Sequence, residues 1–119
     1  MLATNERVSH AIKTADGVTI SVDCYRQGER AAAVVICPGF FQSKDTATFQ
    51  RMSRALAQDY DVLAMDFRGH GRSSGHFTFS ALERADLDAV LAFTQQRYPR
   101  IGIIGFSLGA ATSIHVKTR

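Results

Sequence analysis

The sequence of 119 residues has only two cysteines and contains no long hydrophobic run. Secreted disulfide-rich domains carry more cysteines, so Cys24 and Cys37 are predicted to be buried free thiols in a reducing compartment. No apolar segment approaches the roughly 20 residues needed to span a bilayer, and we expect no membrane span. Residues 1–10 also lack the apolar region of a signal peptide. The expected location is therefore cytoplasmic.

Charge of one sign is not clustered anywhere in the chain. The formal net charge is +3, and the basic residues, most of them arginines, are scattered from Arg7 to Arg119. Scattered charge is typical of a solvated surface, whereas nucleic acid and anionic lipid are bound by clustered charge. We therefore expect no nucleic-acid partner.

Repeats and low-complexity segments are also absent, and strand patterns come first. Apolar and polar residues alternate over residues 8–14 and 18–25, around the turn signal Asp16-Gly17, which predicts a β-hairpin. Three short strands are predicted later in the chain, over residues 31–37, 61–67 and 101–105. The first is a continuous apolar run, typical of a strand buried on both faces. The second has an apolar centre at residues 62–65, and the third is short and apolar.

Helical spacing of apolar residues predicts helices over residues 46–58 and 80–98. Asp45 is placed to cap or charge the start of the first helix. The second starts with Ser80-Ala81-Leu82-Glu83, which matches a capping box. The pattern turns helical again from Ser107 onward. Strands that alternate with helices predict an α/β fold, a three-layer sandwich with a mostly parallel sheet and an N-terminal antiparallel hairpin.

The motif Gly105-Phe106-Ser107-Leu108-Gly109 lies between the last predicted strand and a helical segment. Strand, sharp turn and helix form the context of a nucleophile elbow, in which the flanking glycines permit a very tight turn. The turn projects the serine hydroxyl from the carboxyl edge of the sheet. The following helix directs free amides and its dipole at developing negative charge. The context favours Ser107 as a nucleophile over a surface serine in an ordinary glycine-rich turn.

Two further loops follow predicted strands. Pro38-Gly39-Phe40 is either a plain turn or the source of an oxyanion amide. Residues 66–75 read Asp-Phe-Arg-Gly-His-Gly-Arg-Ser-Ser-Gly. With the serine motif, and in this order, these loops resemble the α/β-hydrolase superfamily over roughly residues 8–113. The Gly-His-Gly-Arg-Ser run is most similar to the branch of lysophospholipase-like esterases and serine aminopeptidases.

The resemblance implies a serine hydrolase that cleaves an ester, thioester or amide of a small-molecule acyl substrate through an acyl-enzyme. No cofactor and no metal are implied. Ser107 would be the nucleophile, and the backbone amides of Leu108 and Phe40 would form the oxyanion hole, with Phe41 as the second choice for Phe40. In the loop at residues 66–75, Asp66 and Arg68 would hold the backbone in place rather than take part in the reaction.

Acidic residues are absent after Ser107, and the only histidine that follows it is His115. In this fold the catalytic acid and histidine follow the serine in the chain. His115 lies eight residues along the same predicted helix, about 12 Å from Ser107 and beyond the reach of about 3 Å that a base requires. His70 and His76 are interpreted as loop structure, and His10 as part of the hairpin.

The apolar strand at residues 101–105 would form an open sheet edge. The chain therefore reads as a single partial domain, residues 1–119, truncated after the elbow helix. Three interpretations remain open. The chain is a hydrolase that needs an acid and a histidine from beyond residue 119 and has little activity without them, a non-catalytic remnant or binding module, or a chain that self-associates through this edge.

Four phenylalanines have two possible roles. They can line an apolar acyl site or belong to the core, and core is the favoured interpretation for the last two. They are Phe40, Phe41, Phe77 and Phe79.

Overall fold

The computed structural model describes residues 6–26, 31–39, 41–79 and 81–106. Its elements follow in the order β1 (Glu6–Lys13), β2 (Thr19–Arg26), β3 (Ala32–Cys37), α1 (Ala47–Leu56), β4 (Asp61–Met65), α2 (Glu83–Gln95) and β5 (Arg100–Gly105). These are the strands and helices predicted up to Gly105, in the predicted order. The helix predicted from Ser107 onward lies outside the described residues.

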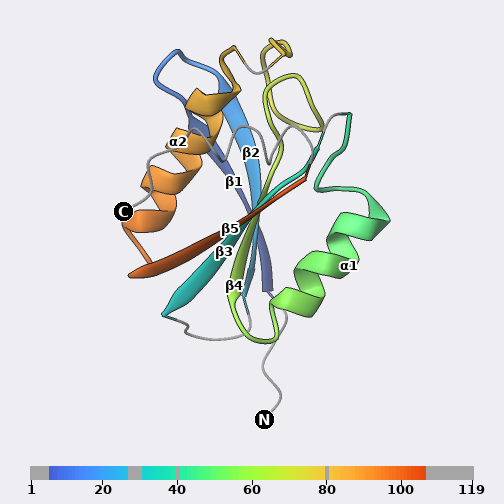
Figure 1. Ribbon diagram of the computed structural model, residues 1–119, viewed down its shortest axis with the longest axis vertical. Coiled ribbons are helices and arrows are strands. Elements are labelled where there is room, and N and C mark those ends of the chain that lie inside the picture. Colours follow the sequence, from blue (N-terminus) through green and yellow to red (C-terminus); the bar gives the residue numbers. More distant parts are fainter. Residues whose placement is uncertain (1–5, 27–30, 40, 80, 107–119) are drawn as a thin grey trace.

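The five strands form one mixed sheet in the order β1-β2-β4-β3-β5 (Figure 1). β1 and β2 are the predicted antiparallel hairpin at one edge, and β2 pairs antiparallel with β4. β3 pairs parallel with both β4 and β5. The strand order and pairing confirm the predicted α/β fold, with a mixed sheet and an N-terminal antiparallel hairpin.

The two helices cover opposite faces of this sheet (Figure 1). The core under α2 joins Leu87 and Val90 to Leu63 of β4, and the core under α1 joins Phe49 to Ile36 of β3. Because β3 and β4 are covered on both faces, nearly every residue in them is buried. This burial explains why β3 and residues 62–65 of β4 are continuous apolar runs instead of alternating ones.

Helix α1 is capped by Thr46, which directly precedes its first residue, Ala47. The Thr46 hydroxyl accepts a hydrogen bond from the backbone N–H of Phe49 at 3.4 Å. The expectation that Asp45 caps this helix is therefore wrong. The Asp45 carboxylate instead pairs with the ammonium of Lys44 at 3.3 Å and the guanidinium of Arg7 at 3.2 Å.

The start of α2 also differs from the prediction. The helix begins at Glu83, so Glu83 is not the third helical residue that a capping box requires. Its carboxylate accepts hydrogen bonds from the backbone N–H and the hydroxyl of Thr78, at 2.8 and 2.6 Å. Ser80, the other partner of the predicted box, lies outside the described residues. The Thr78–Glu83 contact fixes the segment that leads into α2.

Both cysteines are buried free thiols, as predicted. Burial raises the pKa of the Cys24 thiol to about 11. Cys24 therefore stays protonated at neutral pH and behaves as a small apolar side chain.

Candidate functional site

The carboxyl ends of β3 and β5 lie next to each other at one edge of the sheet. Cys37, the last residue of β3, is paired with Gly105, the last residue of β5. The backbone N–H of Phe106 extends this pairing with a hydrogen bond to the Cys37 carbonyl at 3.0 Å. The segments that follow β3 and β5 therefore start next to each other. The predicted site residues Ser107, Leu108 and Phe40 follow these strands and lie outside the described residues.

This edge is also the point where the strand order reverses. From β3, the chain crosses by α1 to β4 on one side, and from β4 it crosses by α2 to β5 on the other side of β3 (Figure 1). In open α/β sheets, ligands bind outside the carboxyl ends of the strands at such a reversal. The topology therefore places the candidate site at the ends of β3 and β5.

The loop after β3 is held by hydrogen bonds on both sides of Phe40. The backbone N–H of Gly39 donates to the side-chain carbonyl of Gln42 at 2.7 Å. The backbone N–H of Phe41 donates to Nε2 of His70 at 3.3 Å. Phe41 also has a φ of 56°, a left-handed conformation that non-glycine residues seldom adopt. The amide of Phe41, the second choice for an oxyanion donor, is thus already engaged.

His70 joins the loop after β3 to the loop after β4. Its ring is buried, and Nδ1 lies 3.0 Å from the carbonyl of Arg68. Since Nε2 accepts from the Phe41 amide, Nδ1 carries the proton and donates it to that carbonyl. Both ring nitrogens are used within the loops, in agreement with the structural role expected for His70. His10 packs its ring 5.1 Å from that of Phe93 and also has a structural role.

Replacing His70 with leucine is expected to lower the free energy of unfolding by about 1–3 kcal/mol, because the Phe41 amide and the Arg68 carbonyl lose their partner. Urea unfolding of the chain measures this loss. The control is His76→Leu in the same loop, since His76 is exposed and should change stability by less than about 0.5 kcal/mol. Equal losses in the two variants would contradict the role assigned to His70.

Asp66 is fully buried at the carboxyl end of β4. Its carboxylate accepts from the backbone N–H groups of Lys44 at 2.9 Å and Arg72 at 3.3 Å, and from the Ser43 hydroxyl at 3.3 Å. Burial raises the pKa of Asp66, and these hydrogen bonds act in the opposite direction. The Lys44 ammonium is buried nearby, 3.2 Å from the carboxylate of Asp23 in β2. Asp66 therefore ties together the loops that follow β3 and β4.

Arg68 ties the same edge to α2 and to the hairpin turn. Its guanidinium contacts the Asp86 carboxylate at 2.7 Å and the Asp16 carboxylate at 2.8 Å. The hydrogen bond from Arg68 lowers the pKa of Asp16 to about 2, whereas burial raises the pKa of Asp86. Asp66 and Arg68 thus both fix the loop at residues 66–75.

Three phenylalanines form a surface group at this edge, here called the aromatic cluster: Phe41, Phe77 and Phe79. Ring centroids lie 6.4 Å apart for Phe41 and Phe77, and 4.5 Å apart for Phe77 and Phe79. Phe41 is 80% exposed and Phe79 is 74% exposed. The core interpretation of Phe79 is therefore wrong, because the chain turns at Phe79 with a φ of 52° and leaves its ring at the surface. Phe77 is half-buried against His70.

The part of the chain that the structure describes has neither a metal-binding cluster nor a membrane-spanning helix. No group of three or more His, Cys, Asp or Glu side chains is arranged to hold a metal ion. No helix in these same ranges combines the length and apolar character of a membrane span.

The chain matches known proteins in its family model and in its fold. The model of the alpha/beta hydrolase family matches residues 34–118. The esterase Pf2001 of Pyrococcus furiosus is 32% identical, with a TM-score of 0.84 over 92% of this chain and 46% of that chain. No curated protein sequence matches the chain.

Two more distant structures share the fold. An α/β serine hydrolase without lid from Xanthomonas campestris is 24% identical, with a TM-score of 0.75 over 95% of this chain and 56% of that chain. Est1E of Butyrivibrio proteoclasticus, solved with ferulic acid bound, is 19% identical, with a TM-score of 0.78 over 87% of this chain and 45% of that chain. The chain spans about half the length of these structures. By its family match and its likeness to the Pyrococcus esterase, the chain belongs to the alpha/beta hydrolase family.

Proposed function

We propose that Ser107 is the nucleophile of a serine hydrolase that cleaves a carboxylic ester, thioester or amide through an acyl-enzyme. The pairing of Cys37 with Gly105, extended by the hydrogen bond of Phe106, carries this proposal. A nucleophile elbow after one strand and an oxyanion loop after its neighbour have to meet at one edge, and this pairing supports that arrangement. The 32% identity to an esterase favours an ester as the substrate.

The proposed oxyanion donors are the backbone amides of Leu108 and Phe40. Gly39 and Phe41, on either side of Phe40, already use their amides in hydrogen bonds. Donors held in place before the reaction stabilise an oxyanion without reorganising during it. The contacts that hold residues 39 and 41 therefore favour Phe40 over Phe41 as the donor.

In the proposed reaction, the Ser107 hydroxyl oxygen attacks the substrate carbonyl carbon while a base removes the hydroxyl proton. The tetrahedral intermediate then expels the alcohol, thiol or amine, which takes up that proton. Water hydrolyses the acyl-enzyme in a second round of the same steps. The carboxylates at this edge, Asp66 and Asp86, accept hydrogen bonds from the loop residues Lys44 and Arg68. We propose that the catalytic acid and base come from residues this chain does not contain, and that the chain alone has little or no hydrolase activity.

The aromatic cluster supports an apolar acyl group as part of the substrate. Exposed aromatic rings that lie together on a surface mark binding sites more often than isolated ones do. Phe41 and Phe79 both have positive φ values, and left-handed geometry costs a non-glycine residue about 1–2 kcal/mol. Such strain is concentrated at functional sites.

A fluorophosphonate probe, which labels activated serines, tests the proposal. The chain alone is expected to label no faster than its Ser107→Ala variant, because a serine without a base is a weak nucleophile. The same chain joined to the residues encoded after codon 119 should label at Ser107. There Ser107→Ala should reduce labelling at least about a thousandfold, and the control Ser113→Ala should not.

Two results would overturn the proposal. One is labelling of the extended protein that persists in Ser107→Ala. The other is a downstream sequence that encodes neither further strands nor an Asp and a His, which would favour a non-catalytic remnant. In that case, the molar mass in solution shows whether the chain self-associates.

A further inference from the structure

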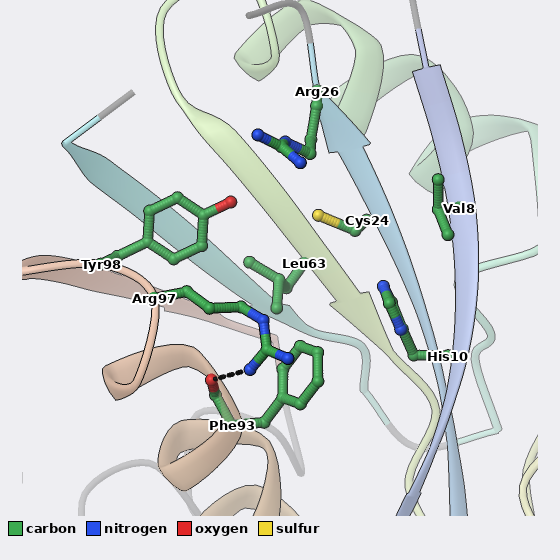
Figure 2. Close-up of a pocket in the computed structure, with 8 residues that line it drawn as sticks. All are labelled: Val8, His10, Cys24, Arg26, Leu63, Phe93, Arg97 and Tyr98. Carbon is green, nitrogen blue, oxygen red and sulfur yellow. Dashed lines mark hydrogen bonds between the residues drawn. The ribbon is translucent and has the colours of Figure 1, made fainter. Parts of the chain in front are cut away.

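A pocket lies on the α2 face of the sheet, toward the end opposite the candidate site. It has a volume of about 160 Å³, and Figure 2 shows side chains of β1, β2, β4 and the end of α2 around one space. The pocket is lined by Val8, His10, Cys24, Arg26, Leu63, Phe93, Arg97 and Tyr98. The pocket shares no lining residue with the candidate site at the ends of β3 and β5. Two of its residues, His10 and Phe93, pack their rings against each other.

The walls of this pocket are mostly apolar. Val8, Leu63 and Phe93 contribute hydrocarbon, and the Cys24 thiol adds to this surface because its raised pKa keeps it protonated. The rings of Phe93 and His10 lie close together on one side. An apolar protein cavity of about 150 Å³ accommodates a benzene ring. The pocket therefore has the size and the lining for one small aromatic or branched aliphatic group.

The charge around the pocket is positive. Two of the eight lining residues are arginines and none is acidic. Arg26 is neutralised by the buried carboxylate of Asp61, with Nε 3.2 Å from Oδ2, and the hydroxyl of Tyr98 also bonds that oxygen. Arg97 has no acidic partner among the described residues. One unneutralised positive charge therefore remains at the pocket, which suits a single negative charge on a ligand.

Arg97 is already held in position. Its Nη1 donates to the carbonyl of Phe93 at 2.9 Å, and its guanidinium carbon lies 3.7 Å from the centre of the Phe93 ring (Figure 2). A guanidinium has further N–H donors, and its planar edge matches a carboxylate. Because the side chain is stacked on Phe93 before a ligand arrives, less conformational entropy is lost on binding.

We propose that this pocket binds a small organic monoanion, a monocarboxylate of about the size of benzoate. The apolar group lies between Val8, Leu63 and Phe93, and the carboxylate contacts Arg97 at the mouth. A dianion is disfavoured, because the buried Asp61 carboxylate lies behind Arg26 and one of its oxygens, Oδ1, has no hydrogen-bond partner among the described residues. The site is independent of Ser107 and of the proposed hydrolase function.

Titration of the ¹⁵N-labelled chain with benzoate, followed by amide NMR shifts, tests this proposal. We expect a dissociation constant of about 1 mM, which is typical of a ligand of this size. Shifts should concentrate at residues 8–10, 24–26 and 93–98. Benzyl alcohol and benzylamine, which have the same ring without the negative charge, should bind at least about tenfold more weakly.

Two variants separate charge from shape. Arg97→Gln removes the charge of an exposed side chain and should weaken benzoate binding at least about fivefold. The matched control Arg51→Gln, on exposed α1 at the opposite face, should leave it unchanged. Val8→Phe, which fills the pocket from the half-exposed strand β1, should weaken benzoate and benzyl alcohol alike. Equal binding of benzoate and benzyl alcohol, equal effects of the two arginine variants, or no saturable shift below about 20 mM would overturn the proposal.

Discussion

Gly71→Ala is expected to lower the free energy of unfolding by at least about 3 kcal/mol, or to prevent folding. An alanine Cβ at Gly71 would collide with the Asp66 carboxylate, 2.5 Å from its Cγ, and would lie 2.8 Å from the Ser43 hydroxyl oxygen. Asp66 cannot move aside without breaking its bonds to the backbone of Lys44 and Arg72. A buried carboxylate that loses its donors is strongly destabilising.

Gly17→Ala is the matched control for backbone strain. Gly71 and Gly17 both have positive φ, 50° and 88°, but no heavy atom lies within 4 Å of a Cβ added at Gly17. The control should therefore cost only the strain of about 1–2 kcal/mol. Urea unfolding of both variants measures the difference. Equal losses would show that strain alone determines the effect and that the packing around Asp66 is tolerant.

Asp86→Ala is expected to destabilise the chain by about 3–5 kcal/mol, because it leaves a buried positive charge without its main partner. The Arg68 side chain is 3% exposed, and Asp86 accepts from its Nε, its Nη2 and the backbone N–H of Arg68. Asp16 remains as a partner, but its side chain is 41% exposed, so water screens this contact more strongly.

The control for this second effect lies on the same helix. Asp88→Ala makes the same chemical change two residues later, at a side chain that is 53% exposed and 4.0 Å from Arg84. Exposed pairs of this kind contribute less than about 1 kcal/mol. The double variant Arg68→Met, Asp86→Leu should recover much of the loss, because it removes both charges. If Asp86→Ala lowers the free energy of unfolding by less than about 1 kcal/mol, the Arg68–Asp86 pair does not stabilise the fold as proposed.

The elements of the fold could be predicted from the sequence, because local patterns record how each element is buried. β3 and residues 62–65 of β4 are covered on both faces and are therefore apolar, whereas the hairpin strands β1 and β2 alternate, with β1 at the edge of the sheet. The hairpin turn is indicated by Gly17, whose φ is positive. Strand and helix positions agree with the prediction to within a few residues.

The contacts that hold the candidate site could not be predicted, because they join residues far apart in the sequence. Lys44 is completely buried against Asp23, 21 positions earlier, and no local pattern marks it as buried. His70 contacts the amide of Phe41, 29 positions earlier. The prediction for the start of α2 was wrong for a different, local reason: Glu83 accepts hydrogen bonds from Thr78, five residues earlier, instead of forming a capping box. Ser107, Leu108 and Phe40 remain predictions.

The pairing of β3 with β5 also sets an order of events during synthesis. Ala32 pairs with Arg100, so β3 leaves the ribosome almost 70 residues before its partner strand. At about 5–20 residues per second, this interval lasts roughly 3–14 seconds. During that time one side of an entirely apolar strand has no neighbour, and the loops after β3 and β5 cannot meet. The nascent chain is most prone to aggregate in this interval, and the candidate site cannot form before β5 has paired with β3.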